Sequence, residues 1–412
     1  MDKYVIITPT LSNMGGAQMY VRNKALYLQN AGWDVFVFAA DGYNVLIPEL
    51  RQFEYFFPEL NFNKYECSKK TQQRVVASIL TIIGKQVSDK VTIESTSIVE
   101  SVWGEAIARL VGAKHIVFLL QEKNINFNKG ILDYLIFKHH RREVAGINKK
   151  SLYNFFKPFY PIEEETSYRL NASCNNVEAD VDHPLVEFIS KKSKDYVVGL
   201  FSRLDKPYVQ PTLESFKCYI QRHKNVKFIL LLIGSAPNAM TIDKVYDVLG
   251  HQENLDVIIT GYLFPVPTKL LELCNVFLSA AGSSRVCARS GIPTITFDAN
   301  DSLPIGVLGY TTKNTVFRGE DEKPIELSAL LDDILFKKVY RRIESNYYTG
   351  IPNFMAHTEF IAQSCQDISY YNVDTISAET RKEKIVSFVL HIIGAKTYYR
   401  VRKYKIGKYF KK

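Results

Sequence analysis

Stretches rich in Val, Ile and Phe alternate with amphipathic helical patterns along most of the chain. Strands are predicted at 4–9, 33–40, 91–96 and 115–121, and again at 197–202, 227–234, 257–261, 276–280 and 294–298. Apolar positions repeat with helical periodicity between them, for example over 17–30 and 102–111. Strands joined by helical crossovers form parallel, doubly wound sheets. The pattern therefore predicts an α/β protein with two successive Rossmann-like halves.

A polar, charged stretch at 190–195 separates the two sets of strands. The chain has 412 residues, which is too long for one ordinary core and suits two domains. We expect one domain over 1–190, a second over 191–375 and a C-terminal tail over 376–412. In open sheets of this kind ligands bind at the carboxyl ends of the strands, so the loops there are the candidate site.

The formal net charge of +9 is concentrated near the C-terminus. From 384 to 412 there are nine Lys or Arg residues and no Asp or Glu, so the rest of the chain is neutral overall. A neutral body argues against a general affinity for polyanions, and we expect no nucleic-acid partner.

Targeting and cysteine patterns point to the cytoplasm. The start, Met1-Asp2-Lys3-Tyr4, lacks the basic head of a secretory signal, and no apolar run approaches the ~20 residues of a membrane span. Six cysteines are scattered without a CxxC pair, which argues against disulfides or a zinc site and for a reducing compartment. We therefore expect a cytoplasmic protein, peripheral on the inner face of the cell membrane, with no cofactor and no metal.

Glycines follow several predicted strands, where their backbone amides could approach a ligand closely. A helix N-terminus after such a turn favours negative charge. The alternative is that tight turns carry glycine for steric reasons only. The candidate ligand-binding residues of this type are Gly15, Gly16, Gly234, Ser235, Gly261 and Tyr262.

Two further loops carry polar or charged groups suited to phosphate. Arg203 and Lys206 follow the strand at 197–202, and they suit a diphosphate because Arg can hold two oxygens while Lys adds a point charge. The alternative is an Arg203–Asp205 pair in a solvated loop. After the strand at 276–280, a helix opens with bare amides and hydroxyl groups, or with a serine cap and no ligand. Its residues are Gly282, Ser283, Ser284 and Arg285.

Taken in order, these pieces resemble glycosyltransferase family 4, whose members have the GT-B fold of two facing Rossmann-like domains with a cleft between them. The resemblance covers roughly 1–375, and the order of the pieces is more specific than any one of them. The matching residues are Gly15-Gly16-Ala17-Gln18, Ser202-Arg203-Leu204 with Lys206, Gly234-Ser235, Thr260-Gly261-Tyr262, Asn275 through Leu278, Gly291-Ile292-Pro293-Thr294-Ile295, and Gly306-Val307-Leu308-Gly309-Tyr310.

The resemblance implies transfer of a sugar from a UDP- or GDP-sugar with retention and without a bound metal. Arg203 and Lys206 would hold the donor diphosphate, at a spacing shorter than the usual one. Leu308 and Gly309 would lie in the family's later donor-side loop.

The chain departs from the family in two segments. Val286 stands where the family has the second of two glutamates, the one that touches the nucleotide ribose, and the first glutamate is also missing. Gln121-Glu122 stand where the family has a histidine near the reacting sugar, and Glu122 could still accept a proton or a hydrogen bond. A DxD sequence, Asp180-Val181-Asp182, lies in an irregular stretch and is read as chance.

The C-terminal tail alternates basic and aromatic residues after an apolar stretch at 385–393. Cations near an anionic membrane add roughly 1 kcal/mol each, and aromatic residues settle at the interface. We expect 384–412 to hold the protein on an anionic membrane. A disordered, solvated end and a single-stranded nucleic-acid contact are the alternatives. A second membrane candidate is the predicted amphipathic helix at 131–142.

Three functions therefore stay open. The leading one is a retaining hexosyltransferase that acts on a lipid-linked or other membrane-associated glycan acceptor in cell-surface polysaccharide synthesis. The second is a transferase-like binding protein that has lost catalysis, which the two missing glutamates motivate. The third is a sugar-nucleotide epimerase of similar two-domain shape.

Overall fold

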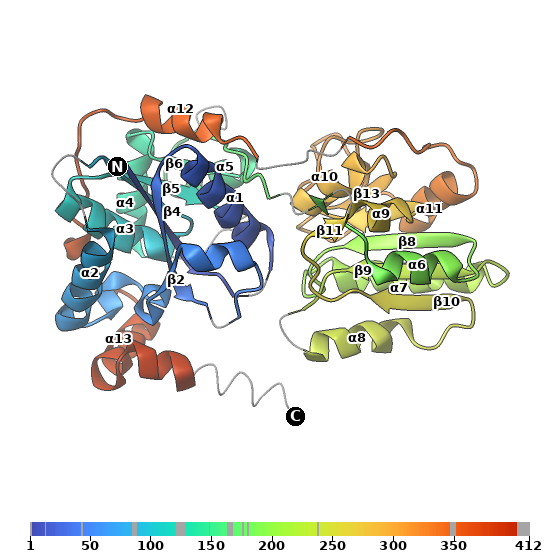
Figure 1. The fold of residues 1–412 in the computed structure, drawn as a ribbon, viewed down its shortest axis with the longest axis horizontal. Coiled ribbons are helices and arrows are strands. Elements are labelled where there is room, and N and C mark those ends of the chain that lie inside the picture. Colours follow the sequence, from blue (N-terminus) through green and yellow to red (C-terminus); the bar gives the residue numbers. More distant parts are fainter. Residues whose placement is uncertain are drawn as a thin grey trace. The chain divides into compact units, whose positions relative to one another are not determined.

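The chain folds into two compact units, one formed by residues 1–174 and 351–412 and the other by residues 175–350. The computed structural model describes residues 2–12, 14–42, 44–84, 89–120, 128–147, 149–162, 168–174, 177–178, 181–236, 239–346 and 352–401. The division differs from the boundaries expected near 190 and 375. The first unit receives the end of the chain because residues after 351 pack on it (Figure 1).

The first unit is built on a parallel six-stranded sheet in the order β3-β2-β1-β4-β5-β6. This is the doubly wound strand order. From β1, successive strands are added first on one side, to β3, and then on the other side, from β4 to β6, so the strand order reverses between β1 and β4. Its elements are β1 (Lys3–Thr10), α1 (Gly16–Asn30), β2 (Asp34–Asp41), β3 (Glu54–Phe56), α2 (Lys69–Ile83), β4 (Val91–Ser95), α3 (Ile98–Val111), β5 (Lys114–Leu119), α4 (Lys129–His140), β6 (Val144–Gly146), α5 (Lys149–Phe156), α12 (Met355–Gln363) and α13 (Arg381–Ile393).

The returning segment is fixed to the first unit by contacts that span more than 200 residues of sequence. The Tyr371 amide donates to Glu105 Oε1 at 2.8 Å, and the Arg141 guanidinium donates to Asp367 Oδ2 at 3.1 Å. Both Glu105 and Arg141 are buried. Because a buried charge left without its partner is costly, these pairs hold α12 and the segment after it on this unit.

A buried polar cluster joins α1, β4 and α12 on one face of the first sheet. Glu94 accepts hydrogen bonds from the hydroxyls of Tyr4, at 2.6 Å, and Tyr20, and its carboxylate lies 3.4 Å from Lys24 Nζ. His357, from α12, stacks on Tyr20 with ring centroids 5.8 Å apart. Burial, with Lys24 nearby, lowers the pKa of His357 to about 4. The imidazole is therefore neutral in the folded protein at neutral pH.

The second unit has the same strand order, β10-β9-β8-β12-β13-β14, with only the last strand antiparallel. The reversal of direction lies between β8 and β12. Its elements are β7 (Val177–Glu178), α6 (Pro184–Lys191), β8 (Tyr196–Phe201), α7 (Val209–Arg222), β9 (Phe228–Ile233), α8 (Ala239–Leu249), β10 (Leu255–Ile259), β11 (Val266–Pro267), α9 (Thr268–Glu272), β12 (Val276–Ser279), α10 (Ala281–Arg289), β13 (Thr294–Phe297), β14 (Pro304–Val307) and α11 (Leu327–Leu335).

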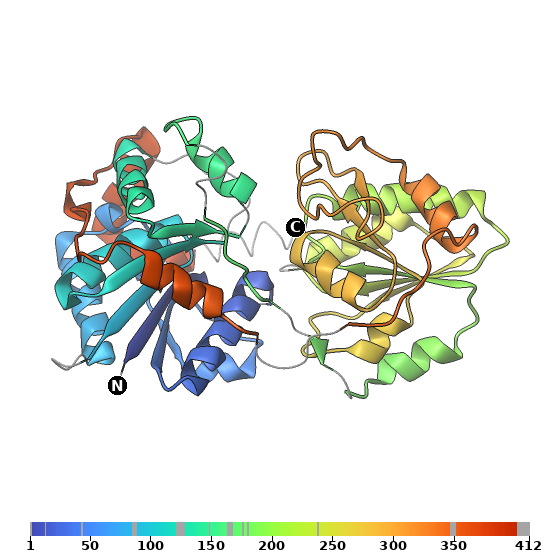
Figure 2. The same ribbon diagram turned by 90° about the horizontal axis from the view of Figure 1, so that it is seen from above.

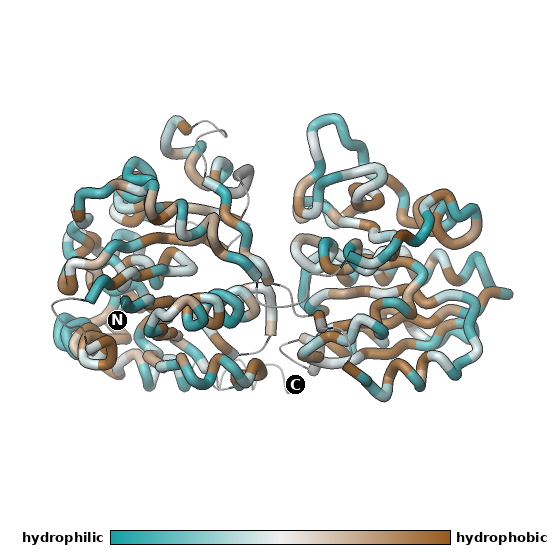
Figure 3. The backbone as a smooth tube through the Cα atoms, turned by 45° about the horizontal axis from the view of Figure 1, so that its top comes forward, coloured by the Kyte–Doolittle hydropathy of each residue, from teal (hydrophilic) through white to brown (hydrophobic). Residues whose placement is uncertain are grey.

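Helices cover both faces of the second sheet (Figure 2). Alternate residues of each strand supply two separate cores: Val198 packs with α7, α8 and α11, whereas its neighbour Val197 packs with α6, α9 and α10. The strands of both units are drawn largely in the brown of hydrophobic residues in Figure 3. A sheet buried on both faces explains why its strands read as continuous apolar runs in the sequence.

Two segments expected to face a membrane are folded parts of the first unit. Helix α4 covers most of the expected segment 131–142, but Ile131, Tyr134 and Leu135 are buried in the core, and Lys138 is ion-paired. Leu132, Ile136 and Phe137 are only half-buried, so part of the apolar surface of this helix is committed to the core and part is not. Residues 381–401 of the expected tail are folded, since α13 begins with a capping box of Thr380 and Glu383 and packs on the first unit. Among the described helices, none is both long and apolar enough to cross a membrane.

Candidate functional site

In the second unit, two of the loops predicted from the sequence follow neighbouring strands, at the point where the strand order reverses. Arg203 follows β8 and Gly282 follows β12, and these strands are neighbours in the sheet. The Ser279 hydroxyl, at the end of β12, donates to the Phe201 carbonyl, at the end of β8, at 2.8 Å. Open α/β sheets bind ligands at this position, at the carboxyl ends of the strands.

Arg203 is half-exposed and forms a two-point ion pair. Its Nε and Nη2 atoms donate to the two carboxylate oxygens of Asp205, both at 3.0 Å. A guanidinium has five N–H groups, so the remaining ones stay available to a second acceptor such as a phosphate. Lys206 directly follows Asp205 in the sequence, and its side chain is exposed. The Arg203–Asp205 ion pair that the sequence suggested as the alternative is thus present. Arg203 can still bind an anion through its other N–H groups.

The loops after β9 and β10 are tied to the Arg203 loop. A Cβ placed on Gly234 would lie 2.0 Å from the Ser202 carbonyl oxygen, and Gly234 has φ +146°. The Ser235 carbonyl accepts from the Leu204 amide at 3.0 Å, and Gly234 pairs with Gly261 in an isolated bridge. Only glycine fits this contact at position 234, because any side chain would strike the neighbouring backbone. Gly234, Ser235 and Gly261 therefore shape the same edge as Arg203.

Tyr262 continues this edge. Its hydroxyl is shielded from solvent and has no hydrogen-bond partner in the described part of the chain. Burial raises the pKa of Tyr262, while the nearby Arg203 guanidinium opposes the rise and Asp205 adds to it. A buried hydroxyl without a partner costs free energy, so this group is suited to a ligand atom.

Helix α10 begins at the same end of the sheet, and its first backbone amides are not capped by a described side chain. Ala281 has a left-handed φ of +53°, and among the described residues no side chain caps the helix. The first amide bonded within the helix is that of Ser284, 3.4 Å from the Ala280 carbonyl, so the Gly282 and Ser283 amides precede the ladder. Such amides, with the helix dipole, favour an anion.

The other two residues of this predicted phosphate seat behave differently. The Ser284 hydroxyl is buried and donates to the Ala281 carbonyl at 2.7 Å, so it stabilises the helix start itself. Arg285 is exposed. Val286, at the position of the absent glutamate, is buried among apolar residues of α6, α9 and β12.

Tyr208 was not predicted from the sequence. It is buried between the two loops, stacks on Phe297 at 5.3 Å, and lies close to Ser202, Ser279 and the backbone of Ala280. Its hydroxyl makes no hydrogen bond of standard geometry within the described part of the chain. Burial raises the pKa of Tyr208, so the hydroxyl is protonated and can donate. No local sequence signal marks this residue, because its role depends on the packing of two distant strands.

Leu308 and Gly309 do not join this site. Because β14 runs antiparallel to β13, the loop after β14 lies at the amino-terminal end of β13, where the Leu308 amide donates to the Thr294 carbonyl at 2.8 Å. Arg203 and Gly282 lie at the opposite end of the strands, the carboxyl end. The structure therefore removes these two residues from the candidate donor site.

In the first unit, Gly15 and Gly16 lie where expected, at the start of α1 after β1. Gly15 is extended, with φ −167°, and among the described residues no side chain caps this helix. A Cβ on Gly16 would meet Cys174 Sγ at an ordinary 3.7 Å, so packing alone does not require glycine there. Glu122 lies outside the described residues.

Glu100 is a second residue that the sequence did not reveal. It lies in the first turn of α3, directly after β4, where the first sheet reverses direction. Its carboxylate accepts a hydrogen bond from the Ser97 hydroxyl and is almost fully buried. Burial raises the pKa of Glu100 to about 7, against the opposing effect of Ser97. A carboxyl group with such a pKa at a ligand-binding edge is a functional candidate.

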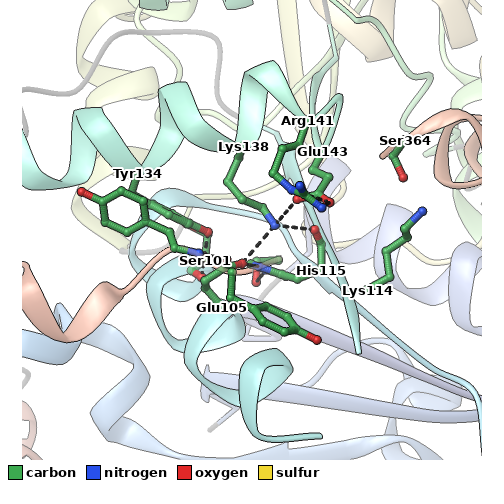
Figure 4. Close-up of polar contacts among 12 residues, drawn as sticks. Ser101, Glu105, Lys114, His115, Tyr134, Lys138, Arg141, Glu143 and Ser364 are labelled. Atoms are coloured by element: carbon green, nitrogen blue, oxygen red, sulfur yellow. Dashed lines mark hydrogen bonds and ion pairs between the residues drawn. The ribbon is translucent and has the colours of Figure 1, made fainter. Parts of the chain in front are cut away.

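A larger buried cluster of charges lies at the amino-terminal end of β5 (Figure 4). Lys138 Nζ donates to Glu105 at 3.0 Å and to Glu143 at 2.6 Å, and His115 Nδ1 lies 2.7 Å from Glu105. Burial and then Lys138 lower the pKa of His115 to about 4. Burial opposes ionisation of Glu105, but Lys138 and His115 outweigh it and lower its pKa to about 2. The groups satisfy one another, which indicates a structural role.

Comparison with solved structures shows the fold. The chain is similar to a glycosyltransferase from Rickettsia africae ESF-5, with a TM-score of 0.58 and 15% identity over 88% of this chain and 94% of that one. It is also similar to the Anabaena protein Alr3699/HepE, solved in complex with UDP and glucose, with a TM-score of 0.55 and 14% identity over 95% and 99% of the two chains. No family model and no curated protein matches the chain. The two-domain GT-B fold predicted from the sequence is confirmed.

Proposed function

We propose that this protein is a glycosyltransferase that moves a hexosyl group from a UDP- or GDP-sugar to a membrane-associated glycan or lipid acceptor, with retention, in cell-surface polysaccharide synthesis. The observation that carries this proposal is that the Arg203 loop and the uncapped start of α10 follow two neighbouring strands, β8 and β12, at the carboxyl ends of the sheet. The likeness to the Anabaena protein, which was solved with UDP and glucose, supports a nucleotide sugar as the donor.

The chemistry requires stabilisation of the leaving group. When the bond from the anomeric carbon to the diphosphate breaks, negative charge grows on the departing nucleoside diphosphate. Arg203 and Lys206 supply fixed positive charge, and the Gly282 and Ser283 amides supply preorganised donors. Donors aimed at developing charge are among the largest contributors to enzymatic rate. These groups perform the charge neutralisation for which other transferases use a metal ion.

The two unpartnered tyrosine hydroxyls complete this proposal. Tyr208 lies under the start of α10, and Tyr262 lies beside the Arg203–Asp205 pair. Each can donate to an oxygen of the bound donor, which would satisfy a hydroxyl that is otherwise buried without a partner.

The test is a thermal-shift comparison of UDP, GDP and their sugars on the full chain. We expect one nucleotide series to raise the melting temperature of the parent protein and to have no effect on Arg203→Ala. Arg222→Ala is the matched control, since Arg222 is an exposed arginine at the far end of α7. It should keep the parent's response. No response of the parent to any nucleotide would refute the proposal.

A second candidate is a nucleotide-sugar-binding protein that has lost catalysis. Val286 favours it, because a buried apolar residue occupies the position of the family's ribose-binding glutamate. The two candidates separate when a radiolabelled donor is incubated with lipid-linked acceptors. Sugar transfer supports the enzyme, whereas nucleotide binding with no transfer to any acceptor supports the binding protein. Release of UDP with an altered sugar and no acceptor would identify the epimerase instead.

A further inference from the structure

Helix α13 carries apolar residues on two opposite sides. Its inner side packs on the core of the first unit through Leu390, which is buried, and Val386. Ile385, Phe388 and Ile392, which we call the outer stripe, are 55%, 67% and 65% exposed. Their spacing of three and then four residues places them on one line along the helix. Packing on the first unit uses only the inner side of the helix. The exposed outer stripe therefore indicates a contact with a second apolar surface.

The sequence from the start of α13 onward carries almost only positive charge. Residues 381–412 contain eleven Lys or Arg residues and a single acid, Glu383. The carboxylate of Glu383 is turned toward the first unit, where it accepts from the Tyr65 hydroxyl at 2.6 Å and from the Thr380 amide at 2.8 Å. On α13 itself, Arg381, Lys382 and Lys384 are exposed beside the outer stripe.

We propose that the outer stripe docks on an anionic lipid bilayer, with α13 lying in the plane of the interface. The three apolar side chains enter the boundary between headgroups and acyl chains, and the flanking cations contact lipid phosphates. Basic residues beside an apolar face are typical of interfacial helices. The inference rests on α13 alone, and it stands or falls separately from the donor site of the second unit.

Charge complementarity favours lipid over a second copy of the chain. A symmetric contact between two α13 helices would bring the same cations face to face, and like charges oppose such an association. An anionic surface neutralises them instead. It also matches an exposed apolar line that runs along the helix.

The docking is measured by flotation of the full chain with two kinds of vesicle. One kind is phosphatidylcholine alone, and the other contains about one-third phosphatidylglycerol. We expect binding to the anionic vesicles only, weakened by salt because surface charges are screened. The double variant Phe388→Gln, Ile392→Gln keeps every charge and should bind at least tenfold more weakly. Leu110→Gln, at an exposed leucine of α3 that is 61% accessible, is the matched control and should bind like the parent.

Depth is measured with one tryptophan added to the native Trp33 and Trp103, whose signal in the parent protein is the baseline. In Phe388→Trp, fluorescence should be quenched by brominated lipids in anionic vesicles, whereas Leu110→Trp should show no added quenching. Equal vesicle binding by the double glutamine variant and the parent would overturn the proposal. So would a parent dimer in sedimentation that the double variant disrupts, with no vesicle binding by either protein, since that result would assign the outer stripe to a second copy.

Discussion

The contact between Gly234 and Ser202 sets the geometry of the Arg203 loop, and it can be tested by adding one methyl group. In Gly234→Ala the new Cβ would lie 2.0 Å from the Ser202 carbonyl oxygen, so the ends of β8 and β9 must separate. Overpacking a rigid contact costs about 1–3 kcal/mol. The φ of +146° adds a further ~1–3 kcal/mol for a residue other than glycine. We therefore expect a loss of roughly 2–6 kcal/mol in the stability of the second unit.

Gly250→Ala is the matched control. Gly250 also has a positive φ, +60°, but a Cβ there would meet its nearest neighbour, Lys217 Nζ, at 3.5 Å. The control therefore carries the backbone strain without the collision, at about 1–2 kcal/mol. Gly250 follows α8 at the edge of the sheet opposite Arg203. The difference between the two variants isolates the contact with Ser202.

The assay is calorimetric unfolding of the full chain with and without UDP. Tryptophan fluorescence does not report on the second unit, because Trp33 and Trp103 both belong to the first. Gly234→Ala should lower the transition of the second unit by more than Gly250→Ala does, and it should also lose most of the stabilisation by UDP. Equal destabilisation by the two variants, with equal responses to UDP, would show that this contact does not shape the site.

Two pH dependences follow from buried groups of the first unit. His115 and His357 have pKa values of about 4, below the ordinary 6.5, so between these pH values the unfolded chain binds more protons than the folded one. As the pH is lowered from 6.5 to 4, the free energy of unfolding should therefore fall by up to about 2.7 kcal/mol per pH unit. Tryptophan-monitored urea unfolding checks this, and a flat profile would contradict it. Glu100→Gln should leave stability unchanged near pH 4.5 but raise it by about 3 kcal/mol above pH 7, since the raised pKa makes ionisation costly in the folded state. A pH-independent difference would refute that reasoning.

Most strands were predictable because they are buried on both faces. Continuous apolar runs such as Phe228–Ile233 leave little doubt about a central strand, and the observed bounds of β1, β2, β4, β5, β8, β9, β10, β12 and β13 agree with expectation to within about two residues. Strands β3, β6, β7, β11 and β14 were missed. They have only two to four residues each, so the alternation that marks a strand cannot be read from them.

The domain boundary was not predictable from local patterns. Residues after 351 join the first unit through contacts such as Tyr371 to Glu105 and Tyr370 to Ala113, which no short window of sequence contains. The charge run near the C-terminus suggested a separate tail beginning at 376. In the structure, α13 instead buries Leu390 in the core of the first unit.

The site shows a similar division between what is local and what depends on topology. Arg203, Gly234 and Gly282 were identified because each follows a parallel strand, and parallel strands end at one edge. The same reasoning failed for Gly309, because β14 is antiparallel and delivers its loop to the other edge. Tyr208 escaped notice because its unpartnered hydroxyl is created by two strands that are 75 residues apart in sequence.

The two sheets share one strand order but differ in the chemistry at the point where each reverses direction. In the second unit, that point carries Arg203 and the bare amides of α10, which suit an anion. In the first unit, the described groups there include the hydroxyls of Thr96 and Ser97, the carboxyl of Glu100, which is protonated below about pH 7, and the uncapped start of α1 at Gly15 and Gly16. Hydroxyls and a neutral carboxyl do not attract a diphosphate, but they can hydrogen-bond the hydroxyls of a sugar. Both units present an uncapped helix start at this point, so the cations Arg203 and Lys206 are what distinguish the second unit as the candidate donor site, because they match the charge of a diphosphate.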